Sequence, residues 1–374
     1  MTMVTYERLH SFKAKDPTAH LDVLSKSSVM FGSPRPAWSG TMQLVHHGRH
    51  PGKSSVMFLP IIDMNPNDIT CVYSTLKYIQ DHAHHHDVTP IITFDQPLWL
   101  KALMIIVTEP VGSDLRNIVL RLGGFHTEMS FLGCIGHLIA ASGLQELLEL
   151  IYASNAMVHM LTGKAIARAV RGHFIVDAAL NAPILASTFN VPIPASDEEF
   201  METEQAHEGS AGKTDLDEAA LLYDKLMQGL VSADQVCQAD VMAKINDALQ
   251  ERKEHLKSSR TATMWLQYMG LVDILRKYIW GEHTGDWNLH LQAVSEMLPY
   301  LAASGHNNYT KSALLYLQRM SRLQEDHPEM YQHFQDGLHV IRRSDRYWAG
   351  LSSDLVIEQV LMRSMNTSSG LTRG

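Results

Sequence analysis

Two carboxylates in this chain stand where they could carry chemistry. Asp95 follows a short β-branched run, residues 91 to 94, and precedes Gln96 and Pro97. Glu358 lies in the segment DLVIEQ, in the last predicted helix. If that helix packs back on the first sheet, Glu358 approaches Asp95, and paired carboxylates at a sheet end suit divalent-metal phosphoryl transfer. Asp95 and Glu358 are therefore the predicted catalytic and metal-binding pair.

His126 is the third candidate catalytic residue. It lies in the turn Gly123-Gly124-Phe125-His126, directly after a second apolar run, NIVLRL. This turn and Asp95 both fall at the carboxyl ends of predicted strands, where α/β proteins gather their ligands. The carboxylates suit Mg²⁺ or Mn²⁺, and a nearby imidazole would favour Mn²⁺. Two carboxylates supply few ligands, so the expected affinity is weak, in the millimolar range.

Each of the three residues also has a purely structural interpretation. Asp95 could end its strand and cap the following helix. Glu358, in a first helical turn, could serve the helix dipole alone. His126, between glycines and an apolar helix, could be a hydrogen-bonded structural histidine. These alternatives stay open on the sequence.

The elements that must position these residues follow from the periodicity. The order strand, helix, strand, helix over residues 88–150 predicts an α/β fold with a short mixed sheet, in which 91–94 and 118–122 are neighbours. We predict four segments: a poorly structured lead-in at 1–55, the first part of the α/β core at 56–151, a mainly helical insertion at 152–335, and a strand and helix at 336–374 that complete the core. Within the insertion, residues 197–217 form an acidic loop.

Composition limits the partners. A formal charge of −9 opposes a surface broadly coated with nucleic acid, so DNA is only weakly supported as a partner. Basic residues still cluster at Lys164, Arg168 and Arg171, and again at Arg342, Arg343 and Arg346. The sequence has no signal peptide and no apolar run long enough for a membrane span, which predicts an intracellular protein without a membrane partner. The motifs of nucleotide hydrolases, esterases, zincins and dinucleotide enzymes are missing from the sequence.

Four stretches carry a resemblance to a known group: ITFDQPLWLKA, RLGGFHTEMSFLGCIGHLI, NNYTKSALLYLQRMSRLQEDHPEMYQHF and RYWAGLSSDLVIEQVLMRSMNTSSG. They resemble animal proteins derived from mobile elements. Their layout, over about residues 55 to 374, is similar to that of RNase H-like transposases with a helical insertion between the second and third acidic residues.

The resemblance implies an RNase H-like fold with Asp95 as the first acid and Glu358 as the third. At the second position, where an acid before Phe-His is expected, the chain has Gly124, so Glu128 or Asp114 would have to substitute. The implied protein is therefore a transposon-derived one that is catalytically impaired or non-catalytic. The alternative is an active Mg²⁺- or Mn²⁺-dependent transposase or nuclease, which cleaves DNA phosphodiesters through Asp95 and Glu358 and acts in the nucleus.

Overall fold

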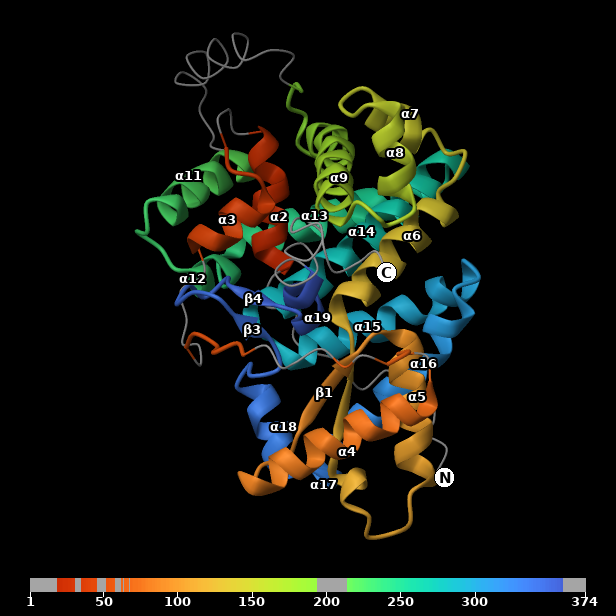
Figure 1. Ribbon diagram of the computed structural model, residues 1–374. Helices are drawn as coiled ribbons and strands as arrows, with labels where there is room; N and C mark the ends of the chain where they lie inside the picture. The colour runs from red at the N-terminus through yellow and green to blue at the C-terminus, as the bar shows by residue number, and fades with distance from the viewer. Residues whose placement is uncertain are drawn as a thin grey trace.

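The computed structural model describes residues 19–30, 35–45, 52–57, 62, 64–66, 68–193 and 214–358. Among these residues, helices account for 71% and strands for 4% (Figure 1). The protein is therefore mainly helical, and the prediction of an α/β, RNase H-like mixed sheet was wrong. None of the described helices combines the length and the apolar character needed to cross a lipid bilayer.

The central sheet contains two parallel strands. β1 (Ile91–Phe94) pairs with β2 (Val119–Leu122), with Ile91 opposite Val119 and Phe94 opposite Leu122. The predicted pairing of these two runs is confirmed. The return near residue 340 forms a separate antiparallel pair, β3 (Ile341–Arg342) and β4 (Gly350–Leu351), instead of adding strands to the first sheet. With two residues each, β3 and β4 are too short to extend it.

Helices cover this small sheet on the lower half of Figure 1. α5 (Gln96–Thr108) connects β1 to the short 3-10 helix η2 (Asp114–Asn117), which leads into β2. α4 (Ile69–His85) packs on α5, and α16 (Asn307–Met320) packs on β2. Asp68 is the N-cap of α4, and its side chain accepts a hydrogen bond from the Thr70 amide.

Part of the expected lead-in is ordered. Within residues 1–55, α2 (Ala19–Ser27), the 3-10 helix η1 (Ser28–Met30) and α3 (Trp38–Val45) are helical. Leu24 and Met42 are almost fully buried, so these helices belong to the core. The prediction missed these helices because each is short and the surrounding sequence is rich in serine, proline and glycine, which are typical of loops. Most of the predicted acidic loop 197–217 lies outside the described residues.

The interval 152–335 is largely helical wherever it is described, as its 3.6-residue period predicted. Besides α16, the described helices from the end of β2 onward are α6 (Gly124–Leu138), α7 (Leu144–Glu149), α8 (Ser154–Leu161), α9 (Ile166–Phe189), α11 (Asp215–Met227), α12 (Ala233–Cys237), α13 (Asp240–Leu256), α14 (Arg260–Thr284), α15 (Trp287–Ala303), α17 (Leu323–Asp326), α18 (Pro328–Gln335) and α19 (Ser353–Val356).

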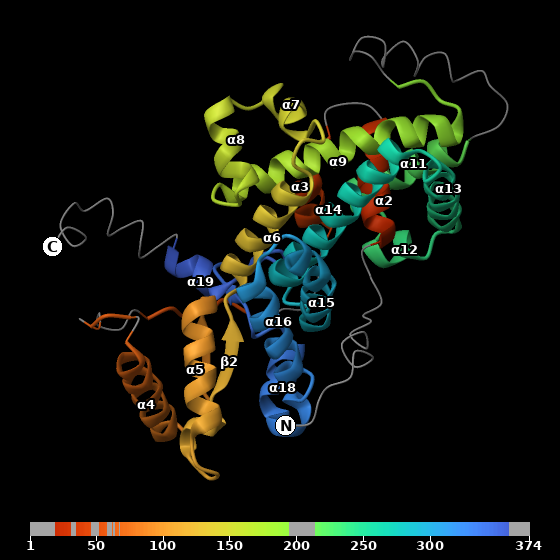
Figure 2. The same ribbon diagram turned by 90° about the vertical axis from the view of Figure 1, so that its right-hand side faces the viewer.

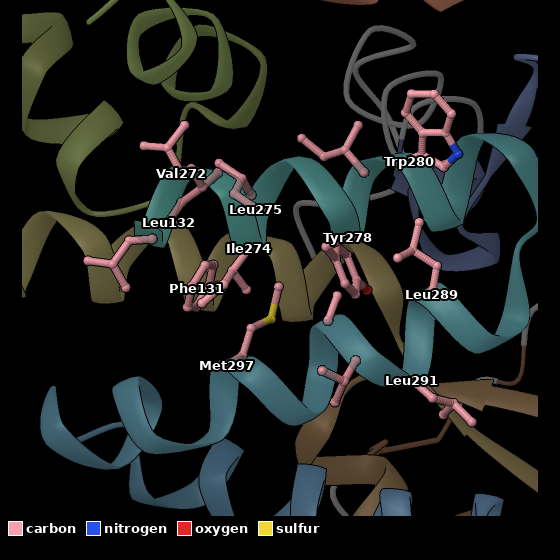
Figure 3. Packing of buried hydrophobic residues seen from close by; sticks show 14 of the residues in the cluster. Phe131, Leu132, Val272, Ile274, Leu275, Tyr278, Trp280, Leu289, Leu291 and Met297 are labelled. Atoms are coloured by element: carbon pink, nitrogen blue, oxygen red, sulfur yellow. The ribbon is translucent and has the colours of Figure 1, made fainter. Parts of the chain in front are cut away.

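The core is centred where α6, α14 and α15 meet. Phe131 on α6 points toward Ile274 on α14 and Met297 on α15, and all three are buried (Figure 3). Burial of such side chains stabilises a fold by about 1.5–3 kcal/mol each. This packing fixes the start of α6, and with it the Gly123–His126 turn, against the two long helices.

Candidate functional site at the strand ends

Asp95 lies at the carboxyl end of β1 and caps α5. Its Oδ1 accepts a hydrogen bond from the Leu98 amide at 3.2 Å, and Pro97 occupies the first turn, where a missing amide proton costs nothing. The capping role predicted as the alternative for Asp95 is therefore real. Asp95 is only half-buried, so this cap remains partly accessible to solvent.

Two glycines open that turn to a distant segment. The Gly123 amide donates to the Phe94 carbonyl at 2.8 Å, which continues the sheet by one bond. A Cβ on Gly123 would lie 2.5 Å from Asp354 Oδ2, and one on Gly124 would lie 2.5 Å from Ser352 Oγ. Glycine is required here because α19 packs directly on the start of α6 and on β1.

Asp354, on α19, is the acid closest to His126 in the described chain. Its carboxylate accepts hydrogen bonds from the amides of Phe125 at 3.1 Å and His126 at 3.2 Å. Its Oδ2 also contacts His126 Nδ1 at 3.1 Å. Asp354 thus caps the N-terminus of α6 from outside that helix, where a negative charge is favoured by the helix dipole.

The charges of Asp95 and Glu358 both affect the pKa of His126, the third predicted site residue. The hydrogen bond that His126 makes to the Asp354 carboxylate raises the pKa of His126, whereas burial lowers it. The negative charges of Asp354, Asp95 and Glu358 raise this pKa further. Asp95 and Glu358 therefore both act on the His126 imidazole. Glu358 is exposed, just beyond α19. The return of the last helix to the first sheet, on which the pairing of the two acids depended, is present in the structure.

We call Asp95, His126, Asp354 and Glu358 the strand-end cluster. Two further ionisable side chains lie near it. Burial raises the pKa of Glu128 to about 8, with a smaller contribution from the charges of Glu282 and Asp354. Burial likewise raises the pKa of Tyr309 to about 12, and the charges of Asp95 and Asp354 add to it. Of the two proposed substitutes for the missing acid, Glu128 lies beside Asp354, whereas Asp114 precedes β2 at the opposite end of the strand.

A buried network of ion pairs and hydrogen bonds around Glu282 lies next to the site. Arg121 on β2 pairs with Glu282 on α14, with Nη2 and Oε1 2.8 Å apart. The other Glu282 oxygen accepts from Ser352 Oγ at 2.5 Å, and His290 Nδ1 lies 2.8 Å from Oε1. Burial alone would raise the pKa of Glu282, but the Arg121 charge and His290 hold that pKa well below its usual value. Because Ser352 also begins α19, this network fixes the helix that carries Asp354.

Sequence reasoning missed Asp354 as a member of the site. The segment DLVIEQ was selected for Glu358 alone. A helix cap supplied across 228 residues leaves no local pattern, because the groups that donate to the Asp354 carboxylate are backbone amides. The available signal was the pair of glycines before His126, which require a close neighbour.

The cluster is an incomplete metal site as it stands. Within the described ranges, no three His, Cys, Asp or Glu side chains are already arranged to hold a metal ion. Asp95, Asp354 and Glu358 nevertheless offer oxygen donors, the ligands that hard divalent cations prefer. The Asp354 carboxylate already accepts hydrogen bonds from two backbone amides and contacts His126. A bound cation would therefore require the carboxylates of Asp95, Asp354 and Glu358 to move closer to one another.

Comparison with known proteins places the chain in a family. Searches of curated proteins and of solved structures found no match. A family model described as a domain of unknown function, DUF8702, matches residues 37–374, which include every residue of the strand-end cluster. The chain belongs to the DUF8702 family.

Proposed function

We propose that the strand-end cluster binds a hard divalent cation, Mg²⁺ or Mn²⁺, and that the protein uses it on phosphodiesters of nucleic acid. One observation supports this most directly. Carboxylates from two distant stretches of chain, Asp95 on one and Asp354 with Glu358 on the other, act on a single half-buried imidazole, His126. Like charges gathered in this way repel each other, and a cation relieves that repulsion.

Each residue has a distinct role in this proposal. Asp95 and Glu358, whose carboxylates are the less committed ones, hold the cation, and Asp354 adds a third negative charge. A bound divalent cation would supply charge stabilisation at a phosphoryl oxygen and lower the pKa of a coordinated water. The imidazole of His126, held through Nδ1 by Asp354, is oriented as a general acid or base requires.

A non-catalytic role is the second candidate, and the Asp354 contacts favour it. A carboxylate that already accepts two amide hydrogen bonds serves the fold whether or not a cation binds. In that case the protein retains the cluster as a structural junction. Descent from a mobile-element transposase, suggested by the sequence resemblance, fits either candidate. Action on DNA would place the protein in the nucleus.

The two candidates differ in their response to metal. We expect millimolar Mn²⁺ or Mg²⁺ to raise the melting temperature of the native chain, since a ligand at tenfold its Kd adds about 1.4 kcal/mol. Asp95→Asn should abolish the rise without unfolding the protein, because asparagine also caps helices well. Glu358→Gln should weaken it.

Asp114→Asn is the matched control, since Asp114 is an exposed acid at the far end of β2. It should keep the full response. The same proteins incubated with duplex DNA and Mn²⁺ report on cleavage. Equal melts for the native chain and Asp95→Asn at every metal concentration would refute the cation site and leave the structural junction.

A further inference from the structure

The basic cluster Lys164, Arg168 and Arg171 stands out on a protein of net charge −9. All three side chains are exposed, and within the described part of the chain none of them forms an ion pair. Arg168 and Arg171 are three residues apart on α9, so they share a face of that helix. We call these three residues the basic ridge.

The second basic cluster of the sequence is different. Arg342 is buried, with its guanidinium donating to the carbonyl oxygens of Tyr347 at 2.9 Å and Thr284 at 2.5 Å. It closes the β3–β4 turn against the end of α14. Arg342 is therefore a structural residue, which leaves the basic ridge as the stronger candidate for an anion-binding surface.

The ridge begins beside the strand-end cluster. Gly163, next to Lys164, adopts a φ of +76°, and a Cβ at this position would overlap the Met129 carbonyl oxygen on α6. Thr162 lies equally close, with its carbonyl 3.2 Å from the position of a Cβ on Gly133. Met129 follows His126 by three residues, about 4.5 Å along the helix axis. The turn before α9 therefore contacts α6 between Met129 and Gly133, about one to two helical turns from His126.

Helix α6 connects the two features. α6 leads from the tip of β2, where α19 packs, to the region of α8 and α9 (Figure 2). Lys164 lies in the turn just before α9, and Arg168 and Arg171 lie in its first two turns, about 4.5 Å apart along the helix axis. A nucleic-acid duplex carries one phosphate per about 1.7 Å of its axis, so a ridge of this length can contact several phosphates.

We infer that the basic ridge is the docking surface for the phosphodiester backbone of nucleic acid, which runs from α9 along α6 to the strand-end cluster. This inference rests on the proposed function, because the docked nucleic acid would be the substrate of the proposed cation site. Backbone contacts of this kind carry no base specificity. They position a strand so that one phosphodiester reaches the carboxylates.

An anionic membrane is the rival partner, because Leu150 and Val158, 81% and 63% exposed, lie on the neighbouring α7–α8 segment. Gly163, in the turn before α9, contacts Met129 on α6. This contact favours nucleic acid as the partner, because it places the basic ridge close to the helix that begins at the strand-end cluster.

The test measures binding of labelled duplex DNA, duplex RNA and single-stranded DNA by fluorescence anisotropy in EDTA. Without a cation, binding reports on the ridge alone. Three phosphate contacts give a slope of log K against log salt of about −2.7, or a loss of roughly 40-fold in affinity between 50 and 200 mM salt. The triple variant Lys164→Gln, Arg168→Gln, Arg171→Gln should lose this salt-dependent binding.

The matched control changes three exposed cations on other helices, Lys77→Gln, Lys225→Gln and Arg260→Gln, and so alters net charge equally. It should bind with nearly native affinity. Equal loss in both variants, or ridge-dependent binding of phosphatidylserine vesicles without binding of nucleic acid, would overturn the inference. The DNA and RNA arms identify which backbone is bound.

Failure of the two proposals can be told apart. If Asp95→Asn binds nucleic acid in EDTA like the native chain while metal leaves both proteins unchanged, the docking surface stands and the cation site fails. If metal stabilises the native chain but the ridge variant binds nucleic acid normally, the cation site stands and the docking surface fails.

Discussion

At the scale of single residues, the strand-end cluster depends on the absence of a side chain at Gly124. A Cβ there would lie 2.5 Å from Ser352 Oγ and 2.9 Å from Glu282 Oε2, both within the buried ionic network. We expect Gly124→Ala to cost about 1–3 kcal/mol, the usual effect of overpacking, measured by urea unfolding. Gly270→Ala on α14 is the control, because a Cβ at Gly270 meets nothing within 4 Å. It should stabilise by about 0.5–1 kcal/mol, and equal effects in the two variants would contradict the steric argument.

The second residue-scale prediction concerns Glu282. Glu282→Gln removes the negative charge that Arg121 meets at 2.8 Å and leaves the arginine buried without a counter-charge. Breaking a buried pair in this way costs about 3–5 kcal/mol, again by urea unfolding. In the variant Arg121→Met, Glu282→Gln the unpaired charge is gone, so the loss should be smaller than in Glu282→Gln alone. A double variant as unstable as the sum of two single ones would show that the two side chains do not interact.

Residue-scale reasoning from the sequence identified Asp95, His126 and Glu358, and the structure brings them into one electrostatic neighbourhood. Asp95 was recognisable because an acid after a β-branched run and before Gln-Pro must lie at a strand end. Asp354 and Glu282 were not recognisable. Their partners are backbone amides and a strand arginine more than a hundred residues away, and no spacing in the sequence records such contacts.

At the scale of elements, the docking of α19 on α6 should depend on pH. The His126 pKa is raised above 6.5, so its contribution to stability is complete below pH 6.5 and is lost as pH rises through the folded value. Glu128, with a pKa raised to about 8, adds a contribution of the same sign, which is lost between pH 4.5 and about 8. The melting temperature should therefore fall from pH 6 to 8.5.

Two variants separate the contributions. Glu128→Gln removes its titration and should flatten the profile, and His126→Gln should flatten the part above pH 6.5. Lys77→Gln, an exposed change on α4, should leave the profile as it is. A native melting temperature that rises over this range would contradict the sign of both shifts.

The same scale explains where the fold prediction failed. β1, β2, α5 and α6 could be predicted because each shows its own periodicity over a compact run. The larger sheet was inferred by joining the return near residue 340 to these strands. Pairing between distant strands is decided by tertiary packing, and here helices such as α16 cover β2, while β3 and β4 pair with each other.

At the scale of the whole molecule, the N-terminal α2 is part of the core although the family match begins at residue 37. Lys26 on α2 pairs with Asp273 on α14, with Nζ and Oδ1 2.6 Å apart, and Leu24 is 1% exposed. We expect Leu24→Ala to cost about 2–5 kcal/mol in urea unfolding. Val29→Ala is the control, since Val29 is 42% exposed, and it should change stability by less than about 0.5 kcal/mol. An equally mild Leu24→Ala would mean that α2 contributes little to the folded chain.

The contact between His126 and Asp354 also sets an order in time. The two residues are 228 positions apart, and a ribosome that adds about 5–20 residues per second needs roughly 10–45 s to make the chain between them. During that interval the start of α6 lacks the Asp354 carboxylate at its N-terminus. A nascent chain therefore carries the first half of the cluster without its closing carboxylate, and any cation chemistry begins only after nearly the whole printed sequence has been translated.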